Sequence, residues 1–188
     1  YANFFPEVLD ISKGRFHVDY AYHLAPMDRG HIEEIPELIE KHGVTSFKIY
    51  MFYGGYGLHG ASSHQHEFLM IDEQEKYDIA HFEFVMRGIQ RAMERFPDRR
   101  DSVSLSRHCE TAEIMAAYTK LVQQEGKLTG LKAYSAARPP HSEGLAICIA
   151  SYLAHETECI NINLLHLTSR KAVEAALKMA KAFPQVNF

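Results

Sequence analysis

Apolar and polar residues alternate near the start of the chain, over residues 15–24. The apolar positions are Phe16, Val18, Tyr20, Tyr22 and Leu24. Because a period of two is typical of a strand that buries one face, this segment is predicted to be the first strand. A helical stripe follows over residues 31–41, and Gly43 is predicted to end that helix in the left-handed conformation. Residues 44–53, strongly apolar with β-branched and aromatic side chains, are predicted to form the second strand.

The rest of the chain continues to alternate between the two patterns. The sequence predicts helices over residues 72–95, 111–125, 142–155 and 169–182, and strands over residues 102–107 and 158–167, with a further strand beginning at Val186. Pro97 is predicted to stop the first of these helices, because proline cannot continue one. Residues 54–65, rich in glycine and histidine, are too irregular for an element and are predicted to be a loop.

This alternation indicates an α/β fold built from βαβ units around a parallel sheet, either doubly wound or closed into a barrel. The pattern contains four strand–helix pairs and the start of a fifth strand. No repeat, linker or low-complexity tract divides the 188 residues, so they are predicted to form a single domain segment. In barrels of this class the chemistry lies where strands end and the following loops begin.

Composition excludes several classes of protein. Twenty Lys and Arg against 24 Asp and Glu give a formal charge of -4, which offers no broad attraction for nucleic acid or an anionic membrane. No apolar run approaches the ~20 residues of a spanning helix. Three widely spaced cysteines favour neither a disulfide framework nor a metal knuckle, so a reducing, cytoplasmic location is predicted. Both ends look cut from a longer protein, since Met is absent and the last residues read as an interrupted strand.

Three predicted strands carry a residue of chemical interest near their ends, namely Lys48, His108 and His166. A single histidine at a strand end is more often an ordinary hydrogen-bonded residue, so the signal is the convergence of the three. The lysine is the least ordinary of them. Because an unpaired ammonium in an apolar strand is costly, Lys48 must be paired, neutral or chemically modified.

Further motifs follow these positions in order along the chain. They are Gly43-Val44-Thr45-Ser46-Phe47-Lys48, Tyr53, His108-Cys109-Glu110, Ala137-Arg138-Pro139-Pro140 with Glu143, and Leu165-His166-Leu167-Thr168-Ser169. Together they resemble the central part of the dihydropyrimidinase and hydantoinase branch of the cyclic amidohydrolases, over most of the chain from Val44 onward. The resemblance implies a TIM-type (β/α) barrel, of which this chain would be a part.

The resemblance also implies a centre of two zinc ions bridged by Lys48 as a carbamate. A carbamate offers two anionic oxygens to a metal pair, whereas an ammonium has no lone pair. By the same resemblance His108 and His166 bind the second zinc, and imidazole nitrogen suits that metal. Tyr53 corresponds to a tyrosine that donates a hydrogen bond to the oxyanion of the tetrahedral state. An aromatic side chain that only packs at the rim is an equally good interpretation of Tyr53, and Tyr50 is a weaker candidate.

The resemblance has two further implications, one for a structural motif and one for the remaining metal ligands. Arg138 and Glu143 match a family motif that is interpreted as a tie between a loop and a helix, without a catalytic part. The remaining metal ligands of the family, an HxH pair and a late aspartate, are expected before Tyr1 and after Phe188. The His64 and His66 pair has the HxH spacing but follows the lysine strand, so it is interpreted as part of a loop.

Two further departures from the family pattern concern the segment after the lysine strand and the neighbours of His108. The segment between the lysine strand and the next histidine is longer than usual, and residues 57–70 are predicted to influence substrate choice at the catalytic rim. His108-Cys109-Glu110-Thr111 replaces the commoner His-Ala-Glu-Asn, so the surroundings of the metal are expected to differ. Cys109 itself is predicted to be a buried packing residue.

The predicted function is that of a zinc-dependent hydrolase that opens a cyclic amide of the dihydropyrimidine, hydantoin or related type. Hydroxide on the metal would attack a ring carbonyl. One alternative is a non-catalytic dihydropyrimidinase-related protein in assembly or signalling; another is an allantoinase or dihydroorotase. The partners implied are a small cyclic amide and further copies of the same chain in a homo-oligomer, with no nucleic acid and no membrane.

Overall fold

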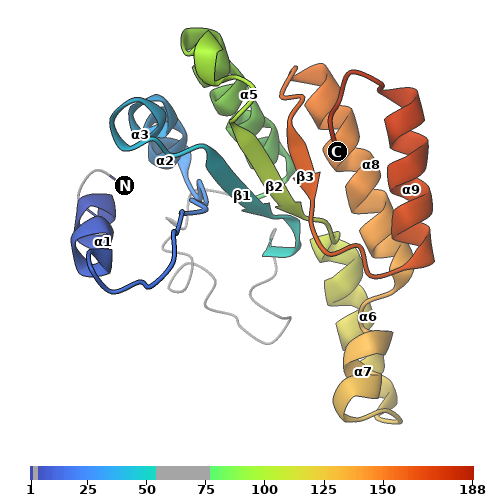
Figure 1. Ribbon diagram of the computed structural model, residues 1–188. Coiled ribbons are helices and arrows are strands. Elements are labelled where there is room, and N and C mark those ends of the chain that lie inside the picture. Colours follow the sequence, from blue (N-terminus) through green and yellow to red (C-terminus); the bar gives the residue numbers. More distant parts are fainter. Residues whose placement is uncertain (2–3, 54–76) are drawn as a thin grey trace.

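The sheet at the centre of the molecule has three parallel strands. The computed structural model describes residue 1, residues 4–53 and residues 77–188. In the described part the strands are β1 (Ser46–Tyr50), β2 (Ser104–His108) and β3 (Ile162–Leu164), paired in the order β1-β2-β3. Since all three strands run in the same direction, their carboxyl ends lie at one edge of the sheet (Figure 1).

Eight helices accompany this sheet in the described part of the chain. They are α1 (Phe4–Ser12), α2 (Arg29–Glu33), α3 (Ile35–His42), α5 (Ile79–Arg95), α6 (Ala112–Glu125), α7 (Gly130–Ala136), α8 (Pro140–Glu156) and α9 (Arg170–Ala182), with short 3₁₀ turns η1 (Met51–Tyr53) and η3 (Pro97–Arg99). Figure 1 shows α5 behind the strands and α8 beside α9, whereas α6 and α7 extend beyond the carboxyl ends of the strands. The fold is thus α/β, as the alternating pattern predicts.

The two faces of the sheet differ in chemistry. Phe47, Ile49 and Leu105 are fully buried and belong to one apolar cluster with residues of α5 and α8. The alternate positions of β1, including Lys48, are only half-buried. Because successive side chains on a strand point to opposite faces, the helices cover one face and the other carries the polar residues.

Arg107 is an exception within the apolar layer. It is fully buried, on the helix-facing side of β2. One of its terminal nitrogens contacts the sulfur of Met86 at 3.3 Å and donates a hydrogen bond to the carbonyl oxygen of Ala150 at 3.2 Å. The other two guanidinium nitrogens have no partner among the described residues. Burial accordingly lowers the pKa of this guanidinium, because a charge far from water is destabilised.

Several helix ends predicted from the sequence are confirmed. Gly43 ends α3 with φ 64°, a conformation that costs glycine little. Pro97 directly follows the residue that ends α5. The helix predicted over residues 31–41 is observed as two helices, because the chain is interrupted at Glu34, two residues before a proline in the first turn of α3.

The first predicted strand is wrong. Residues 15–23 form no strand, and only Leu24 joins the sheet, through an isolated parallel bridge to Phe47. The alternating aromatic residues pack on one another instead, with ring centroids 4.3 Å apart for Phe16 and Tyr20. Val18, which the pattern placed in the buried face, is 75% exposed.

Other elements are shorter than predicted or were not predicted. The strand expected over residues 158–167 is limited to β3, and the strand expected at the C-terminus is an isolated bridge between Asn161 and Asn187. Helices α1 and α7 have no counterpart in the predicted elements. In the part of the chain that the structure describes, no helix is both long and apolar enough to cross a membrane.

Replacing Arg107 with methionine is expected to raise the free energy of unfolding by about 1–4 kcal/mol. A similar apolar volume would remain, while the cost of burying a charge without an ionic partner among the described residues would disappear. Urea denaturation of the two proteins measures the difference. Arg95→Met is the control, because Arg95 is well exposed in its ion pair with Glu40 and such pairs contribute little. A lower stability for Arg107→Met would contradict the prediction.

Candidate active site

Two histidines meet at the carboxyl edge of the sheet. His108 is the last residue of β2, and His166 lies two residues beyond the end of β3. Their ring centroids are 4.3 Å apart, with the ring planes at 66° to each other. The structure therefore brings these two predicted ligands together, from strands that are neighbours in the sheet but far apart in the sequence.

Lys48 lies on the same face of the sheet, one strand away. It is opposite Ser106 in the register, and Tyr50, two residues later, is opposite His108. The ammonium of Lys48 lies 4.4 Å from the centroid of the Tyr50 ring, which is 6.5 Å from that of His108. Among the described residues this ammonium has no hydrogen-bond or ion-pair partner. The aromatic ring of Tyr50 is thus the contact that stabilises its charge.

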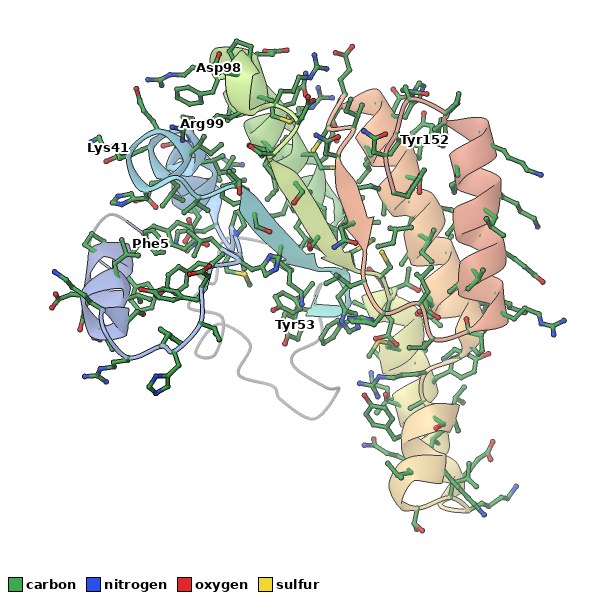
Figure 2. The ribbon with its side chains drawn as sticks, in the orientation of Figure 1. Phe5, Lys41, Tyr53, Asp98, Arg99 and Tyr152 are labelled. Atoms are coloured by element: carbon green, nitrogen blue, oxygen red, sulfur yellow. The ribbon has the colours of Figure 1, made fainter. Side chains whose placement is uncertain are left out.

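Tyr53 completes an aromatic group at this edge. It ends the turn η1, directly after β1 (Figure 2), and its ring stacks on Tyr50 at 5.2 Å between centroids. Phe52 lies between Tyr53 and His108, 4.1 Å and 4.4 Å from their rings. Burial raises the pKa of the Tyr53 hydroxyl, and the nearby Tyr50 raises it further. The phenol therefore keeps its proton at neutral pH and is able to donate a hydrogen bond.

A carboxylate holds the first histidine. The Nε2 of His108 donates a hydrogen bond of 2.8 Å to Oε2 of Glu110, which stands in the loop after β2. The second oxygen of Glu110 lies 3.7 Å from the Nε of Arg138. The guanidinium of Arg138 in turn lies 3.8 Å from the centroid of the Tyr134 ring. All three polar side chains are mostly buried, between 16% and 23% exposed.

A second carboxylate holds the loop that carries His166. Glu143, in the first turn of α8, accepts hydrogen bonds from the backbone nitrogen of Thr168, from the hydroxyl of Thr168 and from the hydroxyl of Ser169, at 2.8–3.1 Å. Ser169 also caps α9 by accepting from the nitrogen of Ala172. The tie between a loop and a helix that the sequence motif suggested for Glu143 is present.

His166 itself has a rare backbone conformation. Its φ of 37° lies in the left-handed region, which is uncommon for residues other than glycine and costs about 1–3 kcal/mol when it is sparsely populated. The ties made by Glu143 begin two residues further on. The surrounding hydrogen bonds thus offset the strain that presents this side chain to the edge of the sheet.

A cavity of about 450 Å³ opens beside the two histidines. Its walls include His108, Glu110, Arg138, Glu143 and His166, together with the two prolines that start α8. Pockets of this size suit small molecules. The cavity places polar side chains from three loops around one space next to the histidine pair.

The donor chemistry at this edge fits a zinc ion in part. Two adjacent imidazoles are suitable ligands, and a carbamate on Lys48 would add the anionic oxygens that its ammonium lacks. Within residues 1, 4–53 and 77–188, no three His, Cys, Asp or Glu side chains gather around a point where one metal ion could bind. The described residues therefore supply some of the donors for a metal centre but not all of them.

The sequence did not predict that Glu110 binds His108, and it predicted for Arg138 only a tie between a loop and a helix. The signal was present, because Glu110 stands two residues after a strand-end histidine in a motif already singled out. The His64 and His66 pair and all of residues 57–70, which were predicted to influence substrate choice, lie outside the described residues. Cys109 is 3% exposed, as its predicted packing role requires.

Comparison with solved structures relates this fold to hydantoinases and dihydropyrimidinases. A dihydropyrimidinase from Brevibacillus agri NCHU1002 matches 97% of this chain with a TM-score of 0.68 and 20% identity. A D-hydantoinase matches 98% with a TM-score of 0.70 and 21% identity. The L-hydantoinase (dihydropyrimidinase) from Arthrobacter aurescens matches 90% with a TM-score of 0.65 and 20% identity.

These likenesses concern the fold. The chain spans about a third of the length of each of these solved structures, 32–34%. No family model and no curated protein matches the sequence. The resemblance to hydantoinases and dihydropyrimidinases that the motifs suggest is confirmed at the level of structure, over nearly the whole chain.

Replacing Glu143 with alanine is expected to lower the free energy of unfolding by about 2–4 kcal/mol. Three hydrogen bonds to a buried, charged acceptor would be lost, and the partly buried backbone nitrogen of Thr168 would lose its partner. Denaturant unfolding measures the change. Glu174→Ala on the exposed face of α9 is the matched control and should change stability little. Equal effects of the two variants would show that the tie does not stabilise the loop.

Proposed function

We propose that the protein to which this chain belongs is a metal-dependent hydrolase that opens a cyclic amide or imide. The observation that carries the proposal is the meeting of His108 and His166, 4.3 Å apart at the carboxyl edge of a parallel sheet, on the face that also carries Lys48. This edge is where enzymes with parallel α/β sheets place their chemistry. The similarity in fold to hydantoinases and dihydropyrimidinases supports the same class of reaction.

The proposed architecture is a segment of a TIM-type barrel. Three adjacent parallel strands, covered by helices on one face, are what such a segment would contain. The polar face with Lys48 would then line the barrel interior. The further metal ligands, an HxH pair and an aspartate, are proposed to lie in parts of the protein beyond this chain.

Lys48 is proposed to act as a carbamate. Its amine, once deprotonated, would add to carbon dioxide through a new nitrogen–carbon bond and release one proton. The carbamate has two oxygens that share a negative charge and can bind metal, whereas the ammonium that lies against Tyr50 has no lone pair to offer. Lys48 would bridge a pair of zinc ions in this form, and His108 and His166 would bind one of them. When bound, zinc makes water acidic enough to attack a carbonyl at neutral pH.

The other residues would act on the substrate or on these ligands. Tyr53, whose phenol carries a proton at neutral pH and whose pKa burial raises further, would donate a hydrogen bond to the ring carbonyl oxygen as negative charge develops there. The aromatic group around it would exclude water from that oxygen. The ring nitrogen would leave with a proton, and the product would be an open-chain amide acid.

The substrate is proposed to be a small cyclic amide such as a dihydropyrimidine or a hydantoin. The cavity of about 450 Å³ is large enough for such a ring. Allantoinase or dihydroorotase activity is the alternative within the enzyme class. Assays with a dihydropyrimidine, a hydantoin, allantoin and dihydroorotate separate these activities. A homo-oligomeric assembly, which the resemblance implies, and a cytoplasmic location, which the cysteine content favours, remain predictions.

Lys48→Ala is expected to abolish hydrolysis in the full-length protein and to reduce its zinc content. Alanine cannot form the carbamate that holds the two ions together. Hydrolysis of dihydrouracil and hydantoin is followed by loss of the ring absorbance, and zinc is measured by atomic absorption. Lys41→Ala on the exposed end of α3 is the control and should be fully active.

The outcome also separates the non-catalytic alternative. A full-length wild-type protein that binds no zinc and hydrolyses none of the substrates would favour an assembly or signalling role. An active Lys48→Ala enzyme would instead contradict the role assigned to the lysine.

Tyr53→Phe is expected to lower kcat by about 100- to 1000-fold with a smaller change in KM. The hydroxyl would matter chiefly in the transition state, where the carbonyl oxygen becomes negative. Steady-state kinetics of the full-length protein measure the two constants separately. Tyr152→Phe is the control, because Tyr152 is exposed on α8 and does not line the cavity. An unchanged kcat for Tyr53→Phe would leave Tyr53 as a packing residue.

A further inference from the structure

A chain of side-chain contacts connects His108 through Glu110 and Arg138 to Tyr134. The imidazole donates through Nε2 to Glu110, Glu110 lies 3.7 Å from the Nε of Arg138, and Arg138 lies against the ring of Tyr134. Glu110 lies in the loop after β2, Tyr134 in α7 and Arg138 in the connection between α7 and α8. All of these contacts are made by side chains and not by the hydrogen bonds of a helix or strand.

We infer that Glu110 and Arg138 are positioning residues that fix the orientation and tautomer of His108. A carboxylate accepts and never donates, so its hydrogen bond to Nε2 requires the proton to be on that nitrogen. The lone pair of the ring is then on Nδ1, which is left free to bind a metal ion. The inference rests on the proposed function and extends it to residues that do not themselves touch the metal or the substrate.

The geometry assigns Arg138 an indirect part. Its nearest approach to Glu110 is on the carboxylate oxygen that His108 does not use, so one cation and one imidazole share the two oxygens of one carboxylate. At 16–23% exposure the three groups are poorly solvated, which strengthens their electrostatic contacts. The stacked Tyr134 ring limits the movement of the guanidinium. Arg138 therefore holds Glu110, and Glu110 holds the ring.

A merely structural role would look different. Glu143 shows that role nearby, because its oxygens bind only backbone and hydroxyl groups of a loop. Glu110 instead accepts a hydrogen bond from His108, the imidazole proposed as a ligand. Partners that orient metal-binding histidines commonly contribute 10- to 100-fold in metal affinity, so the effect is large enough to measure.

The first experiment measures zinc affinity of the full-length protein by competition with a chromophoric chelator. Glu110→Ala is expected to weaken zinc binding by about 10- to 100-fold, and Glu110→Gln, which keeps an acceptor oxygen, by less. Arg138→Ala should weaken binding by about tenfold or less, because it acts through Glu110. In the double variant the second change should add nothing to Glu110→Ala, which is the signature of one residue acting through another.

Glu113→Ala and Arg170→Ala are the matched controls, since both side chains are exposed and stand near the same segments. Each should bind zinc like the wild type. Unfolding free energies of all variants are measured in the metal-free state, so that a loss of stability is not mistaken for a loss of orientation. Additive effects of Glu110→Ala and Arg138→Ala would overturn the inference.

The second experiment needs no metal and no activity. Diethyl pyrocarbonate modifies unprotonated imidazole nitrogens, and mass spectrometry locates the modified residues. In the metal-free protein His166, which is exposed, should react quickly, and His108 slowly. Glu110→Ala should speed the reaction of His108 several-fold, and Arg138→Ala should speed it less.

The two experiments can fail separately. If the wild type binds no zinc while His108 responds to Glu110→Ala, the proposed function is wrong and the positioning contact stands. If the wild type binds zinc but neither variant changes zinc affinity or the reactivity of His108, the positioning role is wrong and the proposed function stands.

Discussion

Parallel, in-register pairing of three short strands is the constraint on which the site depends. Lys48 is separated from His108 by a long stretch of chain, and His108 from His166 by another. His108 and His166 meet at one edge because the strands run in the same direction. Lys48 lies on the same face, two residues before the end of β1, and the ladder of β1 and β2 holds Tyr50 opposite His108. A slip of one residue would turn the imidazole to the apolar face, since side chains alternate between faces. The hydrogen bonds of the sheet therefore fix the chemistry as well as the fold.

The covered face of the sheet stabilises that register. Phe47, Ile49 and Leu105 are completely buried between the strands and the helices. A shift of the strand register by one residue would therefore expose these apolar side chains to water. Arg107 is the one residue of this layer in the described strands that opposes the trend, and its cost is tolerated because the surrounding cluster is large. Because the apolar face stabilises the sheet, the opposite face can carry half-buried polar side chains such as Lys48.

The sequence predicted most elements for identifiable reasons. The buried strands and the helices α5, α6, α8 and α9 have strong periodicity, and their ends carry glycine, proline or capping residues. It failed over residues 15–24, where alternation came from aromatic residues that pack against each other and against Phe5. A two-residue period records only which positions are apolar, and nothing in it says whether a neighbouring strand is available to pair.

The positions of the predicted site residues followed from the same logic, but their partners did not. Strand ends could be read from the sequence, and parallel topology then placed His108 and His166 at one edge, with Lys48 on the same face two residues before the end of β1. Glu110 and Arg138 belong to loops whose mutual approach depends on how α6 and α7 leave the sheet and α8 returns (Figure 1). A helix pair that extends so far beyond the strands has no signal in local periodicity. The groups that orient a site are therefore harder to predict than the groups that form it, although both are needed to hold an imidazole in one direction.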